Sequence, residues 1–119
     1  MDTKIRADWI AALRSGDYEQ GKGQLRETAD DGTTTFCCLG VLCNLHAIAN
    51  PKIAAKELNT EAYFFNSGYL SPVVEAWAGI DGNGGEYGPR DLFGTRSLAN
   101  DNDNGKSFKQ IALIIERNF

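Results

Sequence analysis

Three cysteines and the single histidine of this chain lie between positions 37 and 46, and together they could supply a nucleophile with its base. Cys37 and Cys38 stand at the expected start of a helix, where unpaired backbone amides can lower a thiol pKa. His46 follows Cys37 by nine residues, which is about 13 Å along a continuous helix. Direct pairing is therefore excluded, and we interpret the cysteines as small buried hydrophobic residues. A cysteine-dependent hydrolase is kept as an alternative.

Two further patterns suggest metal sites but are incomplete. Cys43 and His46 have the i, i+3 spacing of two zinc ligands, whereas a structural zinc site needs about four. The polar run 100–105 resembles a calcium loop, but the twelfth position is Ile111 instead of a bidentate glutamate. We expect this run to be a turn before a helix, and we expect no metal and no cofactor. The odd number of cysteines favours reduced thiols.

A segment rich in glycine offers a better candidate for ligand binding. Residues 20–23 would expose backbone amides next to Lys22, with Arg26 close behind, which suits a small anion. The order of glycines is not that of a phosphate-binding P-loop, and a simple hairpin entry would need the same residues. Aromatic residues beside loops could stack on a flat base, although core packing explains most of them as well. The predicted ligand-binding residues are Tyr18, Gln20, Lys22, Arg26, Trp77, Tyr87 and Arg90.

The first half of the chain must position this segment. Apolar residues at one-face spacing predict a helix over about residues 3–15, ended by Gly16. The turn signal at 29–32 before a threonine-rich stretch predicts a hairpin. Residues 37–49 are apolar nearly all round, which predicts a buried central helix that Asn50-Pro51 stops. Gly40 inside this helix predicts a close approach by another backbone.

The second half contains weaker signals. Residues 62–65 read as a short strand, residues 52–61 are ambiguous, and Ser71-Pro72 opens a helix that Gly79 closes. The glycine content of 81–95 predicts a long loop, and Ser107 with Gln110 forms the capping box of a C-terminal helix. The fold class expected is α+β, with helices packed on a short antiparallel sheet around the buried central helix.

Size and charge limit the function classes. At 119 residues and 13.0 kDa, with 42% hydrophobic and 24% charged residues, the chain fits one globular domain over residues 1–119. A formal net charge of −4 and a pI near 4.9 argue against broad nucleic-acid binding. No apolar run is long enough to span a bilayer, and the first residues do not resemble a secretion signal. We expect a cytoplasmic protein with no membrane association, and a homo-oligomer is left open.

Three segments of the chain resemble a family of small uncharacterised proteins of bacteriophages and prophages. They are Trp9-x-x-Ala12-Leu13-Arg14-Ser15-Gly16-x-Tyr18-x-Gln20-Gly21, Phe36-Cys37-Cys38-Leu39-Gly40-Val41-Leu42-Cys43, and Leu98-Ala99-x-x-Asn102-Asp103-x-Gly105-x-Ser107-Phe108-x-x-Ile111-Ala112. The resemblance covers both ends and the middle of the chain. The loop at 81–95 departs from the family's pattern by being longer and richer in glycine, so no specificity is transferred to it.

The resemblance implies a setting and no defined activity. Small phage proteins outside the virion are commonly accessory factors, and many disarm host immunity. We expect a non-enzymatic binding protein in the host-cell cytoplasm that sequesters a nucleotide-like signal molecule between residues 18–26 and the glycine-rich loop. The alternative within the same setting is an inhibitor that binds a host defence protein directly.

Overall fold

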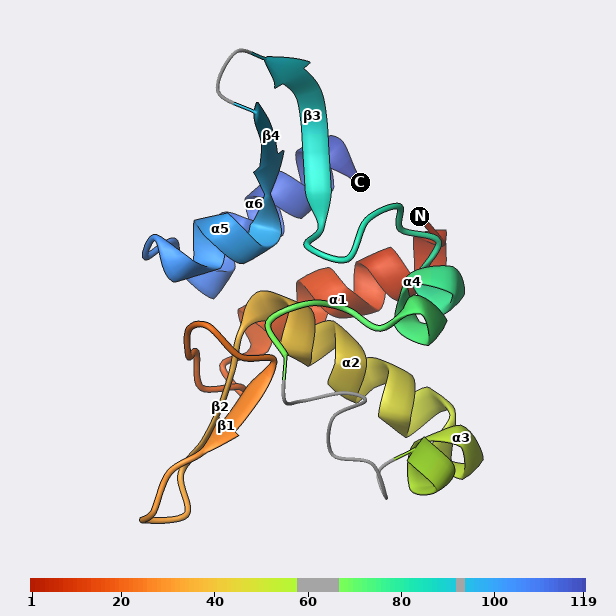
Figure 1. Ribbon diagram of the computed structural model, residues 1–119, viewed down its shortest axis with the longest axis vertical. Helices are drawn as coiled ribbons and strands as arrows, with labels where there is room; N and C mark the ends of the chain where they lie inside the picture. The colour runs from red at the N-terminus through yellow and green to blue at the C-terminus, as the bar shows by residue number, and fades with distance from the viewer. Residues whose placement is uncertain (58–66, 92–93) are drawn as a thin grey trace.

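The computed structural model describes residues 1–57, 67–91 and 94–119, and the side chains of these ranges except 55–57 and 90–91. Helices form most of the described chain, and two β-hairpins project from them (Figure 1). In chain order the elements are α1 (Thr3–Ser15), β1 (Arg26–Thr28), β2 (Thr34–Phe36), α2 (Cys38–Ala49), α3 (Pro51–Glu57), α4 (Pro72–Ala78), β3 (Glu86–Asp91), β4 (Gly94–Ser97), α5 (Leu98–Asp103) and α6 (Phe108–Asn118). This architecture confirms the α+β class.

Helix α1 has the predicted bounds and lies across α2. The Asp2 side chain accepts a hydrogen bond from the Ile5 amide and so caps the helix start. Gly16 ends the helix with φ of 80°, a conformation that a side chain would disfavour. Trp9 is fully buried, and its indole nitrogen donates to the Cys38 carbonyl oxygen at 3.0 Å. This bond joins α1 to the start of the central helix.

Helix α2 is the buried centre of the fold, as predicted. All six residues from Cys38 to Cys43 are buried, and they contact a core built from α1, α4, α5 and α6. A Cβ atom at Gly40 would lie 1.7 Å from the carbonyl oxygen of Leu25. The predicted close approach of a second backbone at Gly40 is therefore confirmed.

The strands form two separate antiparallel pairs instead of the single small sheet we expected. In the first pair Arg26 lies opposite Phe36 and Thr28 opposite Thr34, which confirms the hairpin after the first helix. Gln20 forms an isolated parallel bridge to Phe36 and extends this pair by one contact. The two pairs lie at opposite ends of the molecule (Figure 1).

The prediction of a long loop over 81–95 is wrong, because the second pair, β3 and β4, lies within this stretch and continues to Ser97. The register shifts between Tyr87 and Asp91, and Gly88 has φ of 74°. An irregularity of this kind accommodates residues that an even ladder excludes. Glycine and proline content alone was therefore a poor guide to this segment.

Two short helices were also missed. Pro51 stands at the start of α3, where its fixed φ suits a first helical residue, so the proline that ends α2 also begins the next helix. Helix α5 occupies most of the polar run that we interpreted as a turn, and the Ser97 hydroxyl caps it. The strand predicted at 62–65 lies outside the described residues.

The remaining helices follow their sequence signals. Ser71 caps α4 and Gly79 ends it, and Ser107 with Gln110 forms the capping box of α6. Helix α6 buries one apolar stripe, and α1 packs against it. Within the described ranges, every helix is too short or too polar to cross a membrane.

Candidate functional site

The main hollow of the described surface lies between α1, the second half of α2, and α4, and its volume is about 470 Å³. We call it the Trp77 hollow. Its lining residues are Asp2, Lys4, Ile5, Asp8, Leu45, Ile48, Ala49 and Trp77. Its volume falls in the range of small-molecule and side-chain pockets, roughly 300–1,000 Å³.

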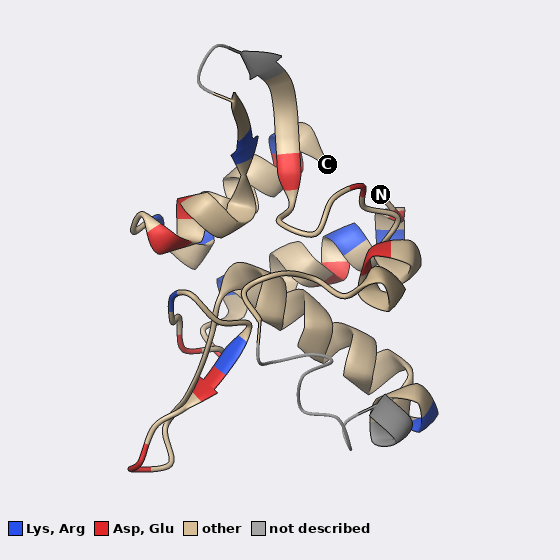
Figure 2. Ribbon diagram, in the orientation of Figure 1, with Lys and Arg blue, Asp and Glu red and all other residues tan. Residues whose placement is uncertain are grey.

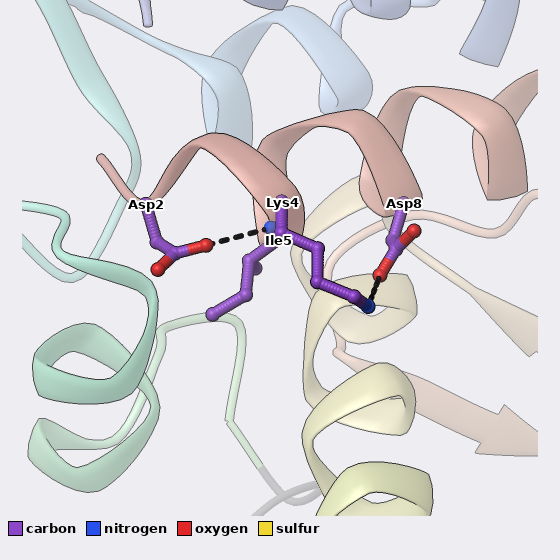
Figure 3. Close-up of polar contacts among 4 residues, drawn as sticks. All are labelled: Asp2, Lys4, Ile5 and Asp8. Atoms are coloured by element: carbon purple, nitrogen blue, oxygen red, sulfur yellow. Dashed lines mark hydrogen bonds and ion pairs between the residues drawn. The ribbon is translucent and has the colours of Figure 1, made fainter.

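The rim of the Trp77 hollow is polar and comes from the first turns of α1 (Figure 3). Asp2 accepts from the Ile5 amide at 2.9 Å, and the Lys4 ammonium lies 2.8 Å from a carboxylate oxygen of Asp8. The hydrogen bond and charge of Asp8 raise the pKa of Lys4. All three charged side chains are exposed, so their pairing contributes little to stability and they remain accessible to a ligand.

The opposite wall is apolar and rests on a buried histidine. The rings of Trp77 and His46 meet edge to face, with centroids 5.0 Å apart and an interplanar angle of 83°. Burial lowers the pKa of His46, which keeps the imidazole neutral at pH 7. The indole is therefore held in place by an uncharged aromatic neighbour.

Exposed apolar side chains continue the wall onto the surface. Ile48 lines the hollow and is 68% exposed, and Ile53 of α3 and Val73 of α4 are also exposed. The sequence contained one signal for this surface: the stretch 37–49 is apolar nearly all round, yet Ile48 near its end is not covered by the core. Sequence reasoning missed Ile48, Lys4 and Asp8 as site residues.

Of the seven predicted ligand-binding residues, Tyr18 and Gln20 have structural roles. The Tyr18 hydroxyl accepts from the Asn44 side chain at 2.6 Å. The Gln20 amide group donates to Asn102 at 2.9 Å and to the Lys106 carbonyl at 2.8 Å, and its oxygen accepts from the Phe108 amide at 3.1 Å. These bonds use the polar atoms of Gln20 to hold the start of α6.

Asn102 is the partner that sequence reasoning missed. This side chain is fully buried, and its oxygen accepts from the Cys38 amide at 3.1 Å as well as from Gln20. Its amide group donates to the Gly21 carbonyl at 2.8 Å. One asparagine thus joins α5, the start of α2 and the segment before β1. We call this set of bonds the Asn102 network.

The other five predicted residues are dispersed. Lys22 is exposed and Arg26 is half-buried on β1. Tyr87 donates its hydroxyl to Asp101 at 2.5 Å, and burial followed by this bond raises its pKa to about 12. The Arg90 side chain lies outside the described residues, and Trp77 is the predicted residue that lines the hollow named after it.

The structure does not bring these residues into one cleft. In Figure 1, β1 lies at lower left, α4 at right and β3 at the top of the molecule. Trp77 is thus separated from both the 18–26 segment and Tyr87. The arrangement expected for a nucleotide held between residues 18–26 and the glycine-rich segment is not formed by the described residues.

The cysteines are packed as core residues. Cys37 is 4% exposed, Cys38 and Cys43 are fully buried, and all three are free thiols. Burial raises the pKa of each thiol, most strongly for Cys38 and Cys43. The reactive thiolate is therefore disfavoured even at the helix start, where the amides of α2 would otherwise lower the pKa.

The comparisons with known proteins give one result. A family model for a domain of unknown function, DUF8296, matches residues 1–119. No curated protein and no solved structure matches the chain significantly. Since the family model covers the whole chain, this protein belongs to the DUF8296 family.

Proposed function

We propose that this protein is a non-enzymatic accessory factor of bacteriophage or prophage type. It acts in the host cytoplasm and counters host immunity by binding a host defence protein at the Trp77 hollow. The setting rests on the resemblance of its three sequence segments to small phage proteins. The choice of a protein ligand rests on the combination of exposed apolar wall and acidic rim in this hollow.

The charge of the hollow favours this ligand over a nucleotide. Asp2 and Asp8 contribute two carboxylates, and the one ammonium, Lys4, is already paired with Asp8. A phosphate group would meet net negative charge here, which is unfavourable at short range. The cations predicted to hold phosphate, Lys22 and Arg26, line no part of this hollow.

The apolar wall resembles the centre of a protein interface. Aromatic anchors in partly enclosed positions supply much of the binding energy in such interfaces, and Trp77 is held rigidly by His46. Ile48 adds an aliphatic contact that the fold itself does not use. The matching partner surface carries an apolar side chain for Trp77 and Ile48, next to a basic residue for the rim.

Two exposed aliphatic residues provide a matched test. Ile48 is 68% exposed in the hollow, and Leu113 is 44% exposed on α6, outside the hollow's lining. A photo-crosslinking residue is placed at position 48 or at position 113 in the bacterial host. The captured protein is identified, purified and titrated calorimetrically against wild type, Ile48→Asp and Leu113→Asp.

The expected result is capture from position 48 and not from position 113. Ile48→Asp should weaken binding about tenfold or more, while Leu113→Asp should leave it within about twofold. Equal effects of the two substitutions would contradict the proposed surface. Saturable heat with a cyclic or ADP-ribose-derived nucleotide, without a captured protein, would replace the proposal with the nucleotide hypothesis.

A further inference from the structure

The carboxylate of Glu86 lies in a cradle of glycine backbone at the start of β3. A Cβ atom at Gly82 would lie 2.0 Å from one oxygen, Oε2, and a Cβ at Gly84 would lie 2.8 Å from the other, Oε1. Any side chain at these two positions would have to displace the carboxylate. The glycines of this turn therefore make room for a negative charge.

This charge has no internal compensation in the described part of the chain. Oε2 of Glu86 is fully enclosed and accepts no hydrogen bond there. Leaving a carboxylate oxygen away from water without a donor is costly, and such groups in folded proteins usually have a partner. An enclosed acceptor of this kind indicates that the partner comes from outside the chain.

A second hollow, of about 210 Å³, lies beside Glu86, and we call it the Glu86 hollow. Ile80 and Phe119 give it apolar walls, and Asp81 adds a second carboxylate. None of the described side chains that line it is basic. Its volume is below the roughly 300 Å³ at which small-molecule sites begin, so it suits one inserted side chain.

We propose that the Glu86 hollow receives a single cationic side chain, a guanidinium or an ammonium, from the partner protein. A guanidinium suits it well because its planar array of donors can satisfy both oxygens of one carboxylate. The described residues contain no group of three potential metal-ligand side chains, which favours an organic cation over a metal ion. The identity of the donor as a partner protein rests on the proposed function, whereas the cation site does not.

The two hollows lie on either side of one junction. The Asp2 amide donates to the Ala78 carbonyl at 2.9 Å, and the next residue, Gly79, lines the Glu86 hollow. Asp2 itself lines the Trp77 hollow. Acidic positions lie on α1, on α4 and at the start of β3 around this junction (Figure 2). One basic and apolar segment of a partner can therefore reach both hollows.

The cation site can be tested without the partner, by titrating the full chain with methylguanidinium chloride and recording ¹H–¹⁵N spectra. The variant is Glu86→Gln, and the matched control is Glu75→Gln, an acidic residue on α4 that lines neither hollow. Sodium chloride at equal ionic strength controls for general salt effects. Wild type and Glu75→Gln should show saturable shifts at the amides of residues 81–86.

Glu86→Gln should weaken this binding roughly tenfold, since the charge-assisted hydrogen bonds are lost. Equal binding by Glu86→Gln, or shifts that never saturate, would overturn the inference. So would saturation of the same amides by Mg²⁺ or Ca²⁺ but not by methylguanidinium. If Glu86→Gln fails to fold by circular dichroism, Asp81→Asn provides the second test and should weaken binding at least twofold.

The outcomes separate this inference from the proposed function. Methylguanidinium binding at Glu86, together with equal effects of Ile48→Asp and Leu113→Asp on the captured protein, supports the cation site and rejects the Trp77 hollow. The opposite pattern rejects the cation site and retains the Trp77 hollow.

Discussion

The backbone of Gly40 lies directly against the carbonyl group of Leu25, and a Cβ atom at position 40 would come 1.7 Å from its oxygen. That oxygen also accepts the Cys37 amide at 3.3 Å, and the Leu25 amide donates to Ser67 at 2.8 Å. Glycine inside a helix costs about 1 kcal/mol against alanine. The cost is offset because the fully buried Leu25 can pack onto the central helix here.

Gly40→Ala should destabilise the protein by more than about 3 kcal/mol, because the added methyl group meets backbone that cannot rotate away. Gly16→Ala is the matched control. Gly16 also has a restricted role, with φ of 80°, but its Cβ would meet nothing within 4 Å. We expect that variant to lose about 1 kcal/mol from the left-handed conformation alone. Urea denaturation measures both, and equal losses would show that the contact with Leu25 is not decisive.

Asn102→Ala should lower the free energy of unfolding by about 3 kcal/mol, because it leaves several buried groups of the Asn102 network without partners. Asn100→Ala on the same helix is the control, since Asn100 is exposed, and its loss should stay within about 0.5 kcal/mol. Urea denaturation again gives the comparison. Similar losses in the two variants would contradict the assignment of Asn102 as a structural centre.

His46 should make the protein less stable in mild acid. Burial lowers the pKa of His46 in the folded state below its ordinary value of 6.5, so the unfolded chain binds this proton more readily. The contribution is fully present above pH 6.5 and is lost as the pH falls through the folded pKa. Because the chain has one histidine, its imidazole resonance can be assigned directly and should titrate with a midpoint below 6.5.

The control for this titration is His46→Phe, which retains a ring against Trp77 but cannot be protonated. The loss of stability between pH 7.5 and pH 5.5 should be smaller in this variant than in wild type. An equal loss in the two proteins would show that carboxylates, and not His46, set the acid dependence.

The thiols should resist alkylation in the folded state. Burial raises the pKa of all three, so iodoacetamide at pH 8 should label the native protein at least tenfold more slowly than the urea-unfolded protein, in which all three react. Mass spectrometry of timed samples measures this. Rapid labelling of Cys37 or Cys38 under native conditions would instead support the cysteine-dependent hydrolase.

The same shifts determine the alkaline limit of stability. The thiols stay protonated in the folded state, while in the unfolded chain they ionise near their ordinary value of 9.0. Their contribution is therefore present below about pH 9 and is lost as the pH rises, by up to about 1.4 kcal/mol per pH unit for each thiol. Cys43→Ala should show a shallower decline of unfolding free energy between pH 9 and pH 10.5, and an unchanged slope would contradict this account.

Local signals predicted the helices well. The bounds of α1 and the caps at Gly16, Ser71 and Ser107 depend on interactions within a few residues, which a sequence displays directly. The buried helix α2 was predicted for a different reason: a segment apolar on all sides has no stable alternative to the interior.

Features that depend on distant partners were not predictable in the same way. Whether Tyr87 belongs to a loop or a strand depends on its pairing with Arg96 across a register shift. Gln20 was read as a ligand contact because its real partners, Asn102 and Phe108, are more than eighty positions away. The enclosure of Glu86 likewise depends on how a glycine turn closes in space, which composition does not specify.

The Asn102 network has an evolutionary consequence. One buried amide serves three segments that lie far apart along the chain, so no single replacement at position 102 can satisfy Gln20, Gly21 and Cys38 together. Descendants of this molecule can drift freely at its rim and hairpin tips. At positions 20 and 102 they must change as a pair or keep both amides.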